Sequence, residues 1–180
     1  MLQHPLEVDN AKGSARLLCL SLARSEMATG EAFDENELQA LLSAPRITSS
    51  NGDQVKIPVL LYPPTPHDMG LLRAAPTLNR DLLDAPEQLR LIVLDGTWRK
   101  SRKMLYLNPL LQALPRLSLR DTPAAYHPIR KAHRPDQLST LEATCAALAQ
   151  LENNGAPFKP LLTAFDGFVA QQFGYRRQVA

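Results

Sequence analysis

The run Arg90–Asp95, with the sequence RLIVLD, constrains the fold more than any other segment of this chain. It is short, continuously apolar, contains β-branched residues and ends in an acid. A strand that faces water on one side alternates apolar and polar residues, whereas a continuously apolar strand has to be covered on both faces. The run therefore predicts one strand of a parallel sheet with helices packed on both sides.

Other segments extend this pattern into an α/β layer fold. Residues 57–64, IPVLLYPP, predict a second buried strand that ends at its prolines, and residues 116–119 predict a weaker third strand. Ser139 and Glu142 form a capping-box pattern, with Ser139 at the N-cap and Glu142 three residues later. The apolar periodicity predicts helices at 35–42, 97–107, 139–151 and 165–173.

Length and composition predict one globular domain over residues 1–180. Hydrophobic residues make up 44% of the 180 residues and charged residues 21%, which is enough apolar material for a sizeable core. Residues 43–56 and 63–80 are rich in Pro, Ser, Asn and Gly and are predicted to be loops inside that domain.

The cysteines and the apolar runs indicate the cellular compartment of the protein. Cys19 and Cys145 are far apart and lie in apolar runs, so we expect buried, reduced thiols. No His, Cys and Asp cluster has the spacing of metal ligands, and we expect no metal site. The N-terminal residues do not form a signal peptide, and no apolar stretch reaches the length of a membrane span. A cytoplasmic location without membrane attachment is the expectation.

Basic residues are concentrated in the second half of the chain. Between Arg99 and Arg134 lie nine of the twenty Lys and Arg residues, with Asp121 as the one acid, so this window has a formal charge of +8. A segment this basic in a chain of net charge +2 indicates a polyanionic partner such as a nucleic acid. The alternative is a solvated surface that happens to be basic.

The segment Asp95-Gly96-Thr97-Trp98 follows the strongest predicted strand directly. In open α/β sheets ligands bind at the carboxyl ends of the strands, so Asp95 is a candidate base or ligand contact. A residue that only shapes the turn is the alternative. Gly96 allows a tight turn or a close approach, and Thr97 can cap the next helix.

The helix predicted after this segment has one basic and one apolar side. Arg99, Lys100, Arg102 and Lys103 fall within an arc of roughly 160°, and Trp98, Ser101, Met104 and Leu105 fill the opposite arc. The pattern predicts a helix that packs its apolar side on the core and presents its basic side to RNA. For Trp98 a packing role and a cofactor-stacking role both stay open.

The remaining polar candidates are weaker. His4 and Glu7 lie so near the N-terminus that we expect them on a frayed surface. His127 and His133 lie among basic residues and could contact phosphates or remain solvated. The sequence contains no GxGxxG, P-loop or GxSxG motif, which counts against classical dinucleotide, nucleoside triphosphate and serine-hydrolase sites.

Taken together, these motifs resemble those of the DTW-domain family, which is named for an Asp-x-Thr-Trp motif. They follow the family's order over nearly the whole chain. They are QHPLE at 3–7, GSARLL at 13–18, LLYP at 60–63, LDGTWRKSRKM at 94–104, PIRKA at 128–132, LSTLEA at 138–143 and FDGFVAQQ at 165–172.

The resemblance implies a tRNA-uridine aminocarboxypropyltransferase. The expected donor is S-adenosylmethionine, the expected products are 3-(3-amino-3-carboxypropyl)uridine in tRNA and methylthioadenosine, and the expected fold is SPOUT-like with a C-terminal knot around the donor. Longer members carry a Cys-rich, zinc-binding segment before the QHP motif. This sequence begins at Met1 without it, so no zinc site is expected within these residues.

The resemblance and the residue patterns above together indicate site residues. Asp95 is the expected catalytic base, which would take the proton from the uracil N3. Contacts to the donor are expected from Leu61, Tyr62, Pro63, Asp95, Gly96, Thr97, Trp98, Leu119, Leu138, Ser139 and Thr140. Contacts to RNA phosphates are expected from Arg99, Lys100, Arg102, Lys103, Arg130 and Lys131.

Three other functions stay open at this point. A SPOUT-type RNA methyltransferase would use the same donor and fold but transfer a methyl group. Aminocarboxypropyl transfer to ribosomal RNA is a second alternative. A non-catalytic RNA-binding module would explain the basic window but not the acid at the end of the strand.

Overall fold

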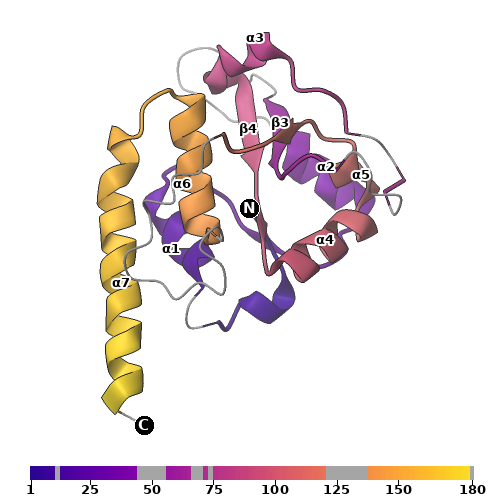
Figure 1. Ribbon diagram of the computed structural model, residues 1–180. Coiled ribbons are helices and arrows are strands. Elements are labelled where there is room, and N and C mark those ends of the chain that lie inside the picture. Colours follow the sequence, from indigo (N-terminus) through magenta and orange to yellow (C-terminus); the bar gives the residue numbers. More distant parts are fainter. Residues whose placement is uncertain (11–12, 44–55, 66–70, 73–74, 121–137, 179–180) are drawn as a thin grey trace. The chain divides into compact units, whose positions relative to one another are not determined.

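The computed structural model describes residues 1–10, 13–43, 56–65, 71–72, 75–120 and 138–178, the last seven of these by their backbone (Figure 1). The chain divides into two compact units, each built from two separate segments. The first unit contains Met1–Val8 and Met27–Ser118, and the second contains Asp9–Glu26 and Leu119–Ala180. The units are described one at a time below, and the single-domain expectation stays a prediction.

The first unit contains two small parallel sheets. One has the strand order β2-β1-β5 and the other has the order β4-β3-β6, and every pairing is parallel. An α/β fold built on parallel strands is therefore confirmed. The strands are β1 (Leu2–Gln3), β2 (Ala28–Thr29), β3 (Ile57–Leu61), β4 (Leu89–Ile92), β5 (Leu94–Asp95) and β6 (Arg116–Leu117).

The prediction of one continuous strand over the RLIVLD run is wrong, because the run contributes to both sheets. Its first part is β4, which pairs with β3, and its last two residues are β5, which pairs with β1. The change of partner occurs at Val93, whose carbonyl accepts a hydrogen bond of 2.8 Å from the Leu2 N–H. A continuously apolar run can contribute strands to two sheets, because it can be buried on both faces in either sheet.

The helices of the first unit connect and cover these strands. The predicted helices at 35–42 and 97–107 are confirmed as α2 and α4. The remaining described parts of the predicted loops carry little regular structure, and residues 44–55, 66–70 and 73–74 lie outside the described residues. The helices are η1 (Pro5–Glu7), α2 (Glu35–Ser43), α3 (Arg80–Leu83), η2 (Pro86–Gln88), α4 (Trp98–Leu107) and α5 (Pro109–Gln112).

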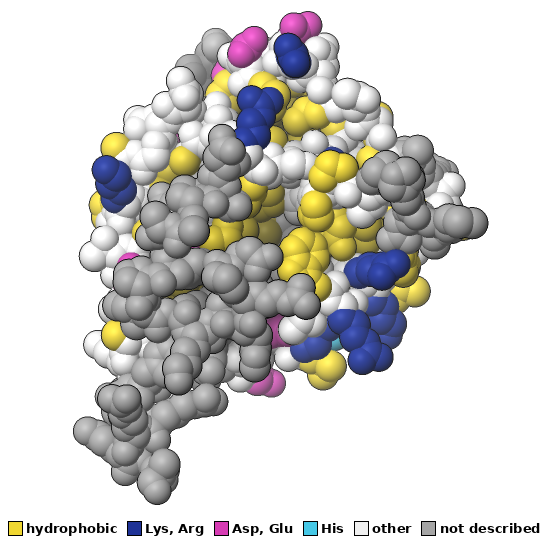
Figure 2. Space-filling view, in the orientation of Figure 1, with side chains coloured by type: hydrophobic (Ala, Val, Ile, Leu, Met, Phe, Trp, Pro, Cys, Tyr) yellow, Lys and Arg dark blue, Asp and Glu magenta, His cyan; other side chains and the backbone are white. Residues whose placement is uncertain are grey.

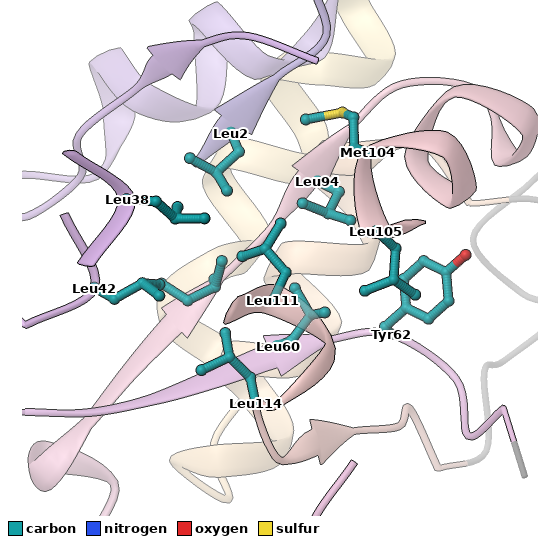
Figure 3. Packing of buried hydrophobic residues seen from close by; sticks show 11 residues of the cluster. Leu2, Leu38, Leu42, Leu60, Tyr62, Leu94, Met104, Leu105, Leu111 and Leu114 are labelled. Carbon is teal, nitrogen blue, oxygen red and sulfur yellow. The ribbon is translucent and has the colours of Figure 1, made fainter. Parts of the chain in front are cut away.

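Leucine-rich packing between these helices and the strands forms the core of the first unit. Met104 and Leu105 of α4 and Leu111 of α5 are completely buried against Leu94 of β5 and Leu60 of β3 (Figure 3). Each such side chain contributes about 1.5–3 kcal/mol through burial. The full cluster comprises Leu2, Leu38, Leu42, Leu60, Tyr62, Ile92, Leu94, Met104, Leu105, Leu111 and Leu114. This core fixes α4 against the strand that precedes it.

Asn108 adds a buried polar connection at the end of α4. Its Oδ1 accepts a 2.9 Å hydrogen bond from the Phe33 N–H, and its Nδ2 donates to the carbonyls of Glu31 at 2.9 Å and Met104 at 2.6 Å. The residue is almost fully buried. Asn108 therefore holds the segment after β2 against the carboxyl end of α4.

The second unit is helical in its described residues. The predicted helix at 139–151 is confirmed as α6 (Thr140–Leu151) with its full capping box, and the predicted helix at 165–173 lies inside the longer α7 (Lys159–Gln178). Two further helices were not predicted, α1 (Ser14–Ser21) and η4 (Ala156–Phe158). The helices α1, α6 and α7 lie side by side (Figure 1).

The two cysteines, both in the second unit, differ in exposure. Cys145 is buried as predicted, and burial raises the pKa of its thiol to about 11, with a smaller contribution from Glu142. Cys19 is only partly buried, so the expectation of full burial is wrong for it. It lies in α1, and the amphipathic helix turns this position partly toward solvent.

Replacing Asn108 with Ala should lower the free energy of unfolding by about 2–4 kcal/mol, because it leaves the partly buried Phe33 N–H and Glu31 carbonyl without this partner. Urea denaturation measures this change. Asn36→Ala, on the exposed surface of α2, is the matched control and should change stability by less than about 0.5 kcal/mol. Equal effects of the two substitutions would contradict the role assigned to Asn108.

In the native protein at pH 8, Cys19 should react with a thiol reagent and Cys145 should not. A raised pKa leaves Cys145 almost entirely protonated at this pH, and the reagent has no access to the buried sulfur. Titration with a chromogenic disulfide should show one reactive thiol in native protein and two after denaturation. Fast reaction of both thiols before denaturation would contradict the burial of Cys145.

Candidate active site

The carboxyl ends of β2, β1 and β5 meet at one edge of their sheet. Gln3 of β1 is in register with Thr29 of β2 and with Asp95 of β5. Because all three strands are parallel, the residues that follow them emerge at the same edge. The motif that begins at Gln3 and the motif that begins at Asp95 therefore come together, although 92 residues separate them in sequence.

Asp95 is held in place by Gln3. The Gln3 Nε2 donates a 2.9 Å hydrogen bond to the Asp95 Oδ2, and both side chains are buried, Asp95 with 6% of its surface exposed. A buried carboxylate requires hydrogen bonds to compensate for lost hydration, and the amide supplies one of them. The predicted strand-end position of Asp95 is confirmed, and its orientation is fixed by a residue that sequence reasoning did not single out.

His4 and Glu7 do not lie on a frayed surface, so that expectation is wrong. His4 is 4% exposed, its Nδ1 accepts a hydrogen bond from the Leu6 N–H at 3.1 Å, and its Nε2 lies 2.8 Å from the Glu31 Oε1. Since Nδ1 accepts, Nε2 carries the proton and donates to Glu31. The physical reason is that β1 pairs on both sides, which draws the N-terminal segment into the interior.

Two lysines of α4 form ion pairs with acids that lie near this edge. The Lys100 Nζ is 2.7 Å from the Glu7 Oε1, and the Lys103 Nζ is 2.7 Å from the Glu31 Oε2. The hydrogen bonds from Lys103 and then from His4 lower the pKa of Glu31 below its usual value. Glu31 is therefore ionised at neutral pH. Its contribution to stability is lost only as the pH falls below the pKa of an ordinary glutamate.

Gly96 and Thr97 form the turn between β5 and α4. The Thr97 side chain accepts a hydrogen bond from the Lys100 N–H, so its predicted role as N-cap is confirmed. A Cβ at Gly96 would lie 3.1 Å from the Cβ of Lys100, closer than most such contacts. Close packing of the turn against the first turn of α4, not an unusual backbone angle, explains the glycine.

Trp98 does not share the buried side of α4 with its neighbours on the helical wheel. Ser101, Met104 and Leu105 are buried as the wheel predicted, but Trp98 is 54% exposed. Its ring contacts Tyr62 edge to face, with centroids 5.7 Å apart and an interplanar angle of 75°. Trp98 lies at the border of the apolar arc and in the first helical turn, where it extends past the core.

The Tyr62 ring also contacts a cation. The Arg116 guanidinium lies 5.7 Å from the ring centroid, and its nitrogens donate to the carbonyls of Leu111 and Gln112. Burial raises the pKa of Tyr62 and lowers that of Arg116. The buried Tyr62 ring therefore packs against the more exposed Trp98 ring and limits its orientations.

The basic side of α4 is partly as predicted. Arg99, Arg102 and Lys103 are exposed and Lys100 is less so, and Figure 2 shows Lys and Arg side chains gathered on the side of the molecule where α4 lies. The ion pairs above occupy both lysines. Arg130 and Lys131, like His127 and His133, lie outside the described residues.

The other predicted donor contacts belong to two different units. In the first unit, Leu61 is partly buried and Pro63 is exposed. In the second unit, Leu119, Leu138, Ser139 and Thr140 are partly buried.

Most of the N–H groups in the first turn of α6 have hydrogen-bond acceptors within the second unit. The Glu142 N–H donates to the Ser139 Oγ, and the Leu141 N–H donates to the Ser14 Oγ. Ser139 therefore caps α6, as its capping-box pattern predicted. The first three N–H groups of α6 belong to Thr140, Leu141 and Glu142. For the Thr140 N–H, the described residues supply no hydrogen-bond partner.

The comparison with known families agrees with the motif order. The family model for the DTW domain matches residues 1–173. The chain belongs to the DTW domain family.

Two curated relatives align with nearly the whole length of this chain. The proteins named tRNA-uridine aminocarboxypropyltransferase 2 from Macaca fascicularis and Mus musculus are 25% and 26% identical to it over 182 residues. The alignment covers 99% of this chain and 56% of each relative, so the chain spans about half the length of these relatives. No solved structure matches the chain.

The described ranges of this DTW domain contain neither a helix that could span a membrane nor a cluster of metal ligands. No helix there has the length and apolar character needed to cross a membrane. Likewise, no group of three or more His, Cys, Asp or Glu side chains in the described part of the chain is placed to hold a metal ion.

Replacing Lys100 with Met should lower the free energy of unfolding by about 1–2 kcal/mol, since it leaves the Glu7 carboxylate, 12% exposed, without its cation. Arg99→Met, one residue away and exposed, is the control and should change stability by less than about 0.5 kcal/mol. Chemical denaturation of both variants measures the difference. If Lys100→Met were as stable as the control, the Lys100–Glu7 pair would have no structural role.

Proposed function

We propose that this DTW-family chain transfers the 3-amino-3-carboxypropyl group of S-adenosylmethionine to N3 of a uridine in tRNA, with methylthioadenosine as by-product. The observation that carries the proposal is the match of nearly the whole chain to proteins named tRNA-uridine aminocarboxypropyltransferase 2. The family match over residues 1–173 supports the same assignment.

The sheet edge supports a chemical role for Asp95. It is a carboxylate at the carboxyl end of a parallel strand, fixed by Gln3 and followed directly by the turn into α4. The proposed step forms a bond between the uracil N3 and the γ-carbon of the donor and breaks the bond between that carbon and sulfur. The electron pair of the broken bond goes to sulfur, and the N3 proton goes to Asp95.

The residues around Asp95 suit such a donor by their chemistry. A sulfonium is a cation, so a carboxylate nearby stabilises it, and the N-terminus of α4 favours the donor's own carboxylate. In the first unit the donor contacts expected from the sequence are Leu61, Tyr62, Pro63, Asp95, Gly96, Thr97 and Trp98, and the first six are kept in this proposal. The contacts expected from Leu119, Leu138, Ser139 and Thr140 of the second unit are part of the proposal, as are the SPOUT-like fold and its C-terminal knot.

For the RNA, the exposed arginines of α4 are better placed than its lysines. Arg99 and Arg102 are exposed, whereas Lys100 and Lys103 lie 2.7 Å from carboxylates of the chain. An ion pair already formed within the protein must be broken before a lysine can neutralise a phosphate. The proposal therefore keeps all four residues, with Arg130 and Lys131, but assigns the larger share to the arginines. An activity on tRNA also accords with the cytoplasmic location expected from the sequence.

Asp95→Asn should lower the rate of transfer by about 10²–10⁴-fold while the fold persists, because the amide can still accept from Gln3 but cannot take a proton. The measurement is incubation with bulk tRNA and donor, followed by mass spectrometry of the nucleosides. Asp84→Asn, at an exposed position after α3, is the control and should leave the rate unchanged.

The mass of the product separates the proposal from its alternatives. An aminocarboxypropyl adduct on uridine supports the proposal, and a methyl adduct would replace it with a methyltransferase. RNA binding without any adduct would indicate a binding module. A near-normal rate in Asp95→Asn would remove the carboxylate from the proton transfer and leave it the structural role of holding Gln3.

A further inference from the structure

Three residues of α4 form a line of alternating aromatic and cationic side chains. Trp98, Arg102 and Tyr106 are four residues apart, which places them one above the other along one side of the helix. We call these three residues the aromatic–arginine strip. From Trp98 to Tyr106 the strip rises eight residue steps and is about 12 Å long.

Contacts within the first unit hold this strip in shape. The Arg102 guanidinium carbon lies 5.1 Å from the centroid of the Tyr106 ring, and its Nε donates a 2.6 Å hydrogen bond to the Tyr106 hydroxyl. At the other end, the buried Tyr62 supports the Trp98 ring edge to face. A cation above an aromatic ring is favourable by itself, so these contacts orient the side chains before any ligand arrives.

The exposure of Trp98 indicates a ligand that approaches from solvent. With 54% of its surface exposed, the Trp98 indole is accessible to a ligand that approaches from solvent. A small donor molecule is normally enclosed, with most of its surface buried by the protein. A nucleic acid strand, in contrast, stacks its bases on exposed aromatic rings while cations beside the rings contact its phosphates.

The charge around the strip favours the same ligand. Arg99 and Arg102 are exposed beside Trp98, whereas two of the acids near α4, Glu7 and Glu31, each form an ion pair with a lysine, and a third, Asp95, is buried and bonded to Gln3. The arginines therefore give this side of the helix a positive field. An aromatic surface with a positive field fits single-stranded RNA better than it fits an apolar peptide.

We propose that the aromatic–arginine strip binds single-stranded RNA, with a nucleobase stacked on Trp98 and a phosphate held by Arg102. The inference rests on the proposed function for its polymer, RNA, and deepens it. It also changes one expectation, since Trp98 contacts a base of the RNA strand and not the donor.

The chain contains a single tryptophan, so its intrinsic fluorescence reports on this residue alone. Titration of the full chain with a ten-nucleotide single-stranded uridine oligomer should quench that fluorescence in a saturable way. Titration with S-adenosylmethionine alone should leave it nearly unchanged. Quenching by the donor and not by the oligomer would assign Trp98 to the donor and overturn the proposal.

Variants test the strip with an end-labelled oligomer and fluorescence anisotropy. Trp98→Leu should weaken binding roughly 5- to 150-fold, and Trp98→Phe should weaken it less because a ring remains. Arg102→Gln should lower the log–log dependence of affinity on salt by about 0.7, the value for one contact to a single strand. The control Arg80→Gln, an exposed arginine of α3, should change neither quantity.

The outcomes separate this inference from the proposed function. Quenching by RNA without an aminocarboxypropyl adduct on tRNA would keep the strip and refute the activity. An adduct on tRNA, combined with unchanged fluorescence and unchanged affinity in Trp98→Leu, would keep the activity and refute the strip. Absence of any oligomer binding would also refute the strip.

Discussion

The parallel pairing of β1 with β2 and β5 is the constraint on which the candidate site depends. It aligns Gln3 with Asp95 and brings the residues after each strand to one edge of the sheet. Without it, the amide of Gln3 could not reach the Asp95 carboxylate, and His4 could not reach Glu31. Three short strands, two residues each, thus organise polar groups from distant parts of the sequence.

The electrostatics of α4 follow from this arrangement. The N-terminal segment supplies Glu7 to Lys100, and the segment after β2 supplies Glu31 to Lys103. The lysines therefore connect the helix to the sheet edge, while the arginines face solvent. This division suits the two chemistries, because a guanidinium forms planar, paired hydrogen bonds with phosphate and an ammonium serves well as a point charge in an internal ion pair.

Much of the local structure could be predicted because it depends on neighbours in sequence. The capping box at Ser139 and the N-cap at Thr97 were found from the residues alone, since both satisfy N–H groups within one helical turn. The acid at the end of β5 was found because an apolar run stops there. What failed involved partners far away: the division of RLIVLD between two sheets, the burial of His4 and Glu7, and the exposure of Trp98. The QHP motif could have indicated Gln3 as a site residue. In contrast, no motif around Glu31 indicated that Glu31 is the partner of both His4 and Lys103.

The sequence by itself determined the helical caps, the strand-end carboxylate and the buried side of α4, which is formed by Ser101, Met104 and Leu105. The order of its motifs also indicated the DTW family. Only the tertiary structure decided which strand lies beside which, and therefore that Gln3 orients Asp95, that acids neutralise the lysines, and that Trp98 leans on Tyr62 in contact with solvent. The physical reason is the range of the interactions. Capping and helical periodicity act within a few residues, whereas strand pairing and ion pairs join groups that sequence distance does not relate.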